Sequence, residues 1–139
     1  MYYATNIGYI NRITGQAVSH TDENYRYTDL IPLDGVTEIT ANYTARWSTA
    51  GWAVYNDDQS QAIAGGYNKD NPNTKYTAKE EVISKAELLD TMPDAKYIRF
   101  GTISKSYDNT NTNSFLVEIS TPVGVDETVS SLEDQISLV

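Results

Sequence analysis

The sequence predicts an all-β protein, built as an antiparallel sandwich or barrel. Two observations carry this prediction. Short segments rich in β-branched, aromatic and alternating apolar residues recur along the chain, and Gly, Pro, Asn or Asp separates them roughly every ten residues. No recurrent strand–helix–strand spacing is present, as a parallel sheet would require. The 139 residues suffice for one domain with a core, expected over residues 1–122.

Turn residues separate the first four predicted strands. Gly15 is suited to positive φ between the first two strands, which makes them a hairpin, and the third strand stops at Pro32. The Asp34-Gly35 pair marks a tight turn before the fourth strand. These strands are expected at residues 7–13, 17–18, 25–31 and 36–43.

The clearest interior strand is expected at residues 52–56, because the four residues from Trp52 to Tyr55 all suit burial. Trp52 itself is therefore expected mostly in the core. A return strand at residues 61–64 follows a turn. Gly65-Gly66 then opens a polar loop, residues 67–75, which its composition places on the surface.

The stretch after this loop is ambiguous between strand and helix. Val82 and Ile83 suit a strand, whereas residues 79–89 contain good helix formers with acids early in the run. We expect a strand that leads into one helical turn, which ends at Pro93. The strand is expected at residues 81–84, the helical turn at 87–90, and two later strands at 96–104 and 114–120.

The last segment has a different pattern, in which apolar residues are spaced four, three, four and three apart. This spacing is that of a coiled-coil seam, and it predicts a linker and the start of a helical stalk over residues 123–139. A homo-oligomer, trimer or dimer, is then expected through residues 125–139. The alternative is a single amphipathic helix packed on its own domain. Because the pattern runs to the last residue, we expect a longer stalk; the seam consists of Val125, Val129, Leu132, Ile136 and Val139.

Composition argues against several classes of partner. The net charge is −9, and an acidic surface repels phosphate backbones, so nucleic acid is not an expected partner. No apolar run is long enough to cross a bilayer, so membrane insertion is not expected either. The N-terminus also lacks the basic-then-apolar pattern of a signal peptide.

Catalysis, metal binding and cofactors are not expected. The chain has no cysteine and one histidine, His20, which we expect on the surface because no Gly-x-Ser-x-Gly elbow accompanies it. Two loops carry hard oxygen ligands of the kind that calcium uses, but turn formation explains these residues more simply. The two sets are Asn68, Asp70 and Asn73, and Asn56, Asp57 and Asp58.

Sugar recognition fits the residue inventory best. Thirteen of the fifteen aromatic residues are Tyr or Trp, whose rings combine an apolar face with a polar edge. A bound sugar lays its C–H face on such a ring, while planar Asn, Asp or Arg groups bond its hydroxyls. The alternative is that these rings line strands or cover the space between sheets. The expected glycan-binding residues lie in three connecting segments or, for Tyr43, just before one: Tyr43, Arg46, Trp47, Tyr67, Asn68, Tyr107 and Asp108.

Three phrases occur in order along the chain: TDLIPL at residues 28–33, AVYND at 53–57 and MPDAKYIRF at 92–100. This cadence resembles the jelly-roll β-sandwich modules of phage tail, baseplate and tail-fibre proteins and of prophage-encoded proteins, over roughly residues 7–122. The resemblance implies a jelly-roll-like antiparallel β-sandwich with a short C-terminal coiled-coil-type helix. The family pattern has an aspartate where this chain has Asn56, so no role for a carboxylate is carried over there.

The resemblance also implies a function. We expect a non-catalytic module of a phage-like tail or fibre protein that binds cell-surface polysaccharide, located in a virion or at the extracellular surface. The alternative is a structural assembly or trimerisation module of a fibre, with no ligand of its own. Binding to a glycan array, and its loss in a Trp47→Ala variant of unchanged melting temperature, would separate the two.

Overall fold

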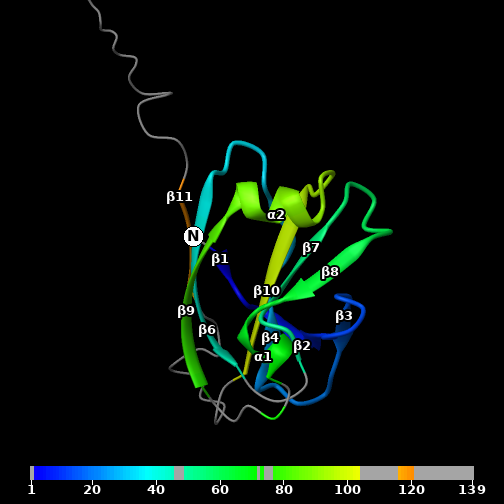
Figure 1. Cartoon of the computed structure of the whole chain (residues 1–139). Coiled ribbons are helices and arrows are strands. Elements are labelled where there is room, and N and C mark those ends of the chain that lie inside the picture. The colour runs from blue at the N-terminus through cyan, green and yellow to red at the C-terminus, as the bar shows by residue number, and fades with distance from the viewer. Residues whose placement is uncertain (1, 46–48, 72, 74–76, 104–115, 121–139) are drawn as a thin grey trace, which may run out of the picture.

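Two antiparallel β-sheets, packed face to face, make up the described part of the chain (Figure 1). The computed structural model describes residues 2–45, 49–71, 73, 77–103 and 116–120. The prediction of an all-β, sandwich-like fold is confirmed. The expected coiled-coil helix at residues 123–139 lies outside the described residues.

The first sheet has four strands in the order β1-β11-β6-β9, and β9 forms one edge of it. Strand β6 pairs along its whole length with β9, from Glu38 opposite Ser84 to Ala45 opposite Thr77. The strands are β1 (Tyr2–Tyr3), β6 (Glu38–Ala45), β9 (Thr77–Ser84) and β11 (Leu116–Ser120).

The second sheet has seven strands in the order β3-β2-β4-β10-β7-β8, and β5 also pairs with β10. Strands β4 and β5 lie one after the other along β10, because β4 pairs with residues 101–103 and β5 with residues 97–98. The strands are β2 (Asn6–Ile10), β3 (Ala17–Ser19), β4 (Tyr25–Tyr27), β5 (Ile31–Pro32), β7 (Trp52–Tyr55), β8 (Ala62–Gly65) and β10 (Tyr97–Ile103).

Thr28 joins the two short strands β4 and β5. Its backbone N–H donates to the carbonyl of Phe100 at 2.9 Å, and its Oγ1 accepts from the Phe100 N–H at 3.1 Å. The same hydroxyl donates to the Asp29 carbonyl at 2.8 Å. Between β4 and β5, the buried Thr28 side chain thus takes the place of a main-chain acceptor. The backbone hydrogen-bonding groups of β10 therefore keep their partners where the neighbouring strand is interrupted.

Alternating apolar residues of β6 form the core between the sheets. Ile39, Ala41, Tyr43 and Ala45 are buried, and the residues between them are more exposed. This period of two is what a strand with one covered face requires. The facing sheet contributes Val54, Ile98 and Phe100 to the same cluster.

The larger sheet curls, so the turn of its β2–β3 hairpin packs against β7 and β8 of the same sheet. The turn is closed by Asn11, whose Oδ1 accepts the N–H groups of Ile13 and Thr14, and by Gly15 at a φ of 74°. The Tyr55 hydroxyl donates to the Gly15 carbonyl from a second buried cluster. The predicted hairpin is thus confirmed.

Two short helices lie at opposite ends of the sandwich (Figure 1). Helix α2 (Lys85–Thr91) begins at Ser84, whose side chain accepts from the Glu87 N–H, and it buries Leu88. Its position agrees with the predicted helical turn before Pro93. The sequence predicted an irregular loop at residues 67–75, and this prediction is wrong in part, because Tyr67–Asp70 form helix α1.

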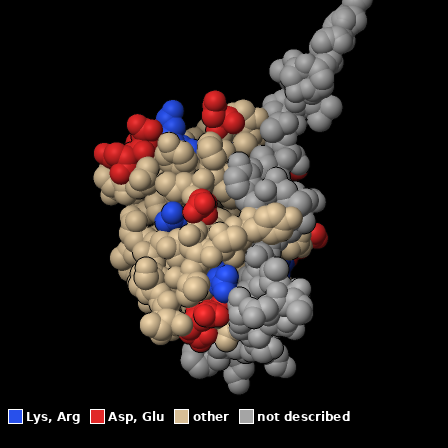
Figure 2. Space-filling view, turned by 180° about the vertical axis from the view of Figure 1, so that it is seen from behind, with Lys and Arg blue, Asp and Glu red and all other residues tan. Residues whose placement is uncertain are grey.

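Charged side chains are interspersed on the surface. On the face shown in Figure 2, Lys and Arg alternate with Asp and Glu, and neither sign forms a continuous stripe among the described residues. No helix in the described ranges is long and apolar enough to cross a membrane.

Candidate functional site

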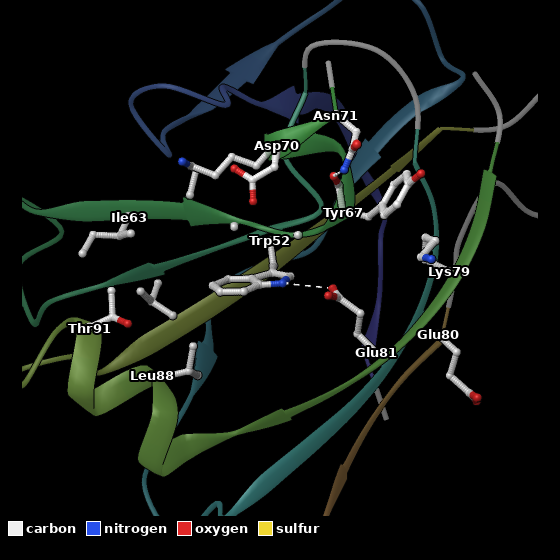
Figure 3. A pocket seen from close by; sticks show the side chains of 15 residues that line it. Trp52, Ile63, Tyr67, Asp70, Asn71, Lys79, Glu80, Glu81, Leu88 and Thr91 are labelled. Atoms are coloured by element: carbon white, nitrogen blue, oxygen red, sulfur yellow. Dashed lines mark hydrogen bonds between the residues drawn. The ribbon is translucent and has the colours of Figure 1, made fainter. Parts of the chain in front are cut away.

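A pocket of about 660 Å³ opens where the edge strands of the two sheets, β8 and β9, face each other. Figure 3 shows it in close view, with α2 at one end and α1 at the other. Its wall contains Ile63 and Leu88, its centre is the indole of Trp52, and polar side chains surround its other end. The polar side chains belong to Tyr67, Lys69, Asp70, Asn71, Lys79, Glu80 and Glu81.

The position of the Trp52 indole depends on a glycine. Trp52 begins β7 and pairs with Gly65 of β8. A Cβ atom on Gly65 would lie 2.3 Å from the nearest indole carbon, which is closer than any real contact. The absence of a side chain at Gly65 therefore lets the indole lie flat against the neighbouring strand.

The carboxylate of Glu81 connects the two sheets at the floor of the pocket. The Trp52 Nε1–H donates to its Oε1 at 3.1 Å, and the Tyr43 hydroxyl donates to the same oxygen at 2.6 Å. Glu81 lies on β9 and Trp52 on β7, so the bond drawn in Figure 3 joins strands of different sheets. Burial, followed by the hydrogen bond to Glu81, raises the pKa of Tyr43 above its ordinary value.

Tyr67 and Lys79 form the rim beside this floor. The Tyr67 side chain is 36% exposed, and the Lys79 ammonium lies 4.3 Å from its ring centroid. This distance is that of a cation–π contact. The Tyr67 N–H donates to the Tyr43 hydroxyl oxygen at 3.0 Å, which ties the rim to the floor.

Hydrogen bonds from outside the helix also hold α1 in place. Arg12 donates from Nε and Nη2 to the Lys69 carbonyl at 3.1 and 2.9 Å. The Asn71 side chain donates to the Tyr67 carbonyl at 2.7 Å. These contacts fix a helix that is too short to be stable alone, and they present Asp70 and Asn71 at the pocket.

Three of the predicted glycan-binding residues are described by the structure, and one of them lines the pocket. Tyr67 lines the pocket, as a recognition residue must. The Tyr43 ring is 3% exposed, so it offers no bare face for stacking, and its hydroxyl instead orients Glu81 and Tyr67. Asn68 is 1% exposed and donates to Thr49 at 2.8 Å, so it too is interior. Arg46, Trp47, Tyr107 and Asp108 lie outside the described residues.

Several pocket residues were not predicted as glycan-binding residues, among them Trp52, Lys79 and Glu81. Trp52 was expected mostly in the core; it does pack on the core cluster, but it also lines the pocket. Lys79 and Glu81 lie on the inner face of β9 together with Ile83. Strand alternation in this segment was the available signal, because a Lys-x-Glu-x-Ile pattern places two charges on the same face as a core residue.

A second group of rings lies on the hairpin side of the larger sheet. The His20 ring stacks on Tyr25 at 4.8 Å between centroids, and Tyr9 meets both rings edge-on at 5.8 and 5.9 Å. His20 is exposed, as predicted. These rings do not line the pocket described above.

The Asn and Asp residues of the loop that follows β7 form a turn. Asn56 Oδ1 accepts from the Gln61 N–H, and Asp58 Oδ1 accepts from the Ser60 N–H. The hydrogen bonds from Ser60 lower the pKa of Asp58. Within the described ranges no group of three or more His, Cys, Asp or Glu side chains is arranged to hold a metal ion.

Comparison with known proteins adds no identification. No family model, no curated protein and no solved structure matches the chain.

Proposed function

We propose that this protein is a non-catalytic glycan-binding module of a phage-like tail or fibre protein, and that the pocket between β8 and β9 is its binding site. The observation that carries the proposal is the combination of one indole, one partly exposed phenol and several planar polar groups around a single opening. Its volume of about 660 Å³ lies in the range of small-ligand sites.

Carbohydrate chemistry matches this set of side chains. A pyranose has apolar C–H faces and a rim of hydroxyls, so it needs a ring to lie on and acceptors or donors at its edge. Tyr67 and Trp52 supply rings, and Glu81, Asp70 and Asn71 supply carboxylate and amide groups. In this proposal Tyr43 positions other residues and does not touch the sugar.

Strand pairing supports a jelly-roll fold for the module. Leaving aside the β2–β3 hairpin and β5, the remaining eight strands pair first with last, second with seventh, third with sixth and fourth with fifth. This is the pairing of one long antiparallel ribbon rolled into two sheets, which is the jelly-roll arrangement. The pairs are β1 with β11, β4 with β10, β6 with β9 and β7 with β8.

The three phrases that resemble phage modules support a shared structural unit. Residues 31–32 of the first phrase and residues 53–55 of the second pair with β10, which belongs to the third. A role in a virion appendage rests on this resemblance. In such an appendage, oligomerisation through residues 125–139 would present several weak sites together and raise the overall affinity.

Glycan binding by the isolated chain tests the proposal. A glycan array is read with the wild type and with Tyr67→Ala, and hits are quantified by calorimetry. We expect Tyr67→Ala to weaken binding about five- to tenfold, because loss of one stacking ring costs about 1–1.5 kcal/mol.

Tyr3→Ala is the matched control. Tyr3 is 51% exposed and lies on β1, at the opposite edge of the four-stranded sheet from β9. Equal losses in both variants, or release of reducing ends from a bound glycan, would contradict a non-catalytic site at this pocket. A chain that binds no glycan but assembles normally would favour the structural assembly module.

A further inference from the structure

We infer that the sugar taken by this pocket is neutral or bears an amine, and that the pocket rejects sugars carrying a carboxylate, because its floor offers an acceptor and no free donor. The inference rests on the proposed glycan-binding function. It concerns the class of sugar, which the aromatic rings alone leave open.

The two donors at the floor are already engaged. An indole has one N–H and a phenol one O–H, and in this protein both are given to Oε1 of Glu81, from Trp52 at 3.1 Å and from Tyr43 at 2.6 Å. Neither can donate to a ligand without leaving Glu81. The floor therefore presents the remaining acceptor capacity of a carboxylate, which suits a hydroxyl or an ammonium group.

Charge acts in the same direction. Glu81 is partly buried on the inner face of β9, where solvent screens it less than a surface carboxylate. A sugar carboxylate placed about 4 Å from the Glu81 carboxylate would be repelled by it, and this repulsion is stronger in the partly buried pocket than in bulk water. The whole chain carries a net charge of −9, which also slows the approach of acidic glycans.

Two lysines line the pocket, Lys69 on α1 and Lys79 on β9, and Lys79 is the one that shares a strand with Glu81. Its ammonium lies over the Tyr67 ring, 4.3 Å from the ring centroid. An acidic ligand that pairs with Lys79 would have to draw the ammonium away from this ring while its own carboxylate remains near Glu81. The arrangement thus favours ligands that leave the Lys79 contact undisturbed.

The test compares matched sugars that differ in one group. Galactose, galacturonic acid and galactosamine, and the corresponding glucose series, are titrated into the full chain at neutral pH and followed by calorimetry. We expect the neutral sugar to bind about tenfold or more tighter than the uronic acid, and the amino sugar to bind at least as tightly as the neutral one.

Two glutamine variants locate the effect. In Glu81→Gln the ratio of neutral to acidic affinity should fall to about threefold or less, although neutral binding is also expected to weaken. Glu38→Gln removes the same charge from an exposed carboxylate on β6 that does not line the pocket, and should leave the ratio unchanged. Circular dichroism checks that both variants fold, and the wild-type series decides the question even if Glu81→Gln does not.

The outcomes are distinguishable. A uronic acid that binds as tightly as its neutral counterpart would overturn this inference and leave the proposed function standing. An equal change of ratio in both glutamine variants would also overturn it, because the effect would then come from total charge. Failure of every sugar in both series and of every glycan on the array to bind the wild type would remove the proposed function, and this inference with it.

Discussion

Replacing Tyr43 by Phe tests whether the floor of the pocket is held by the hydrogen bonds described above. The change removes the hydroxyl that donates to Glu81 at 2.6 Å and accepts from the Tyr67 N–H at 3.0 Å, and it keeps the ring. A hydrogen bond to a charged group is worth about 1.5–3 kcal/mol, and the Tyr67 N–H loses this acceptor as well. We therefore expect the free energy of unfolding to fall by about 2–3 kcal/mol.

Urea denaturation followed by circular dichroism measures this loss, and Tyr9→Phe is the matched control. The Tyr9 ring contacts His20 and Tyr25, but its hydroxyl has no hydrogen-bond partner among the described residues. A hydroxyl without such a partner contributes little to stability, so the free energy of unfolding of Tyr9→Phe should differ from that of the wild type by less than about 0.5 kcal/mol. If Tyr43→Phe is as mild as Tyr9→Phe, the hydroxyl does not hold the floor together and the reasoning fails.

Three further predictions concern the same framework. Because the pKa of Tyr43 is raised in the folded state, its stabilising contribution is complete below the ordinary value of about 10 and is lost as the pH rises above it. Wild type should then lose up to about 1.4 kcal/mol per pH unit more than Tyr43→Phe, measured by urea denaturation at alkaline pH. Gly65→Ala should lower the melting temperature and weaken glycan binding, because the added methyl group would collide with Trp52 at a cost of about 1–3 kcal/mol. Unchanged binding would show that the indole can move freely. Thr28→Val keeps the shape of the side chain but removes the hydroxyl that bridges Phe100 and Asp29. It should reduce the free energy of unfolding by about 1–2 kcal/mol. An unchanged free energy of unfolding would mean that water replaces the hydroxyl.

The fold was predictable where the pattern of a segment matched its environment. The alternation of β6 gave its buried face, and Gly15 marked the hairpin turn. The same alternation places Tyr43 on the face of Ile39 and Ala41, so its burial was predictable as well. The sequence prediction ended this strand at Tyr43, beside an exposed connection, whereas β6 continues to Ala45.

Other elements depend on contacts between distant residues. Strand β9 begins at Thr77, four residues before the predicted start at residue 81, because pairing with β6 extends a segment of low strand propensity. Helix α1 is held by Arg12, which is far away in the sequence. The pocket requires the edges β8 and β9 of two sheets to face each other, and no local pattern encodes that meeting.

The indole of Trp52 at the pocket floor gives the protein an intrinsic fluorescence signal for ligand binding. Whatever enters the pocket must change the water and charge around Trp52, and indole emission shifts in wavelength and intensity with such changes. The chain has two tryptophans, so a Trp47→Phe background leaves this ring as the sole emitter. Occupancy of the site then becomes visible without a label, in dilute solution and on the millisecond timescale of a stopped-flow mixer.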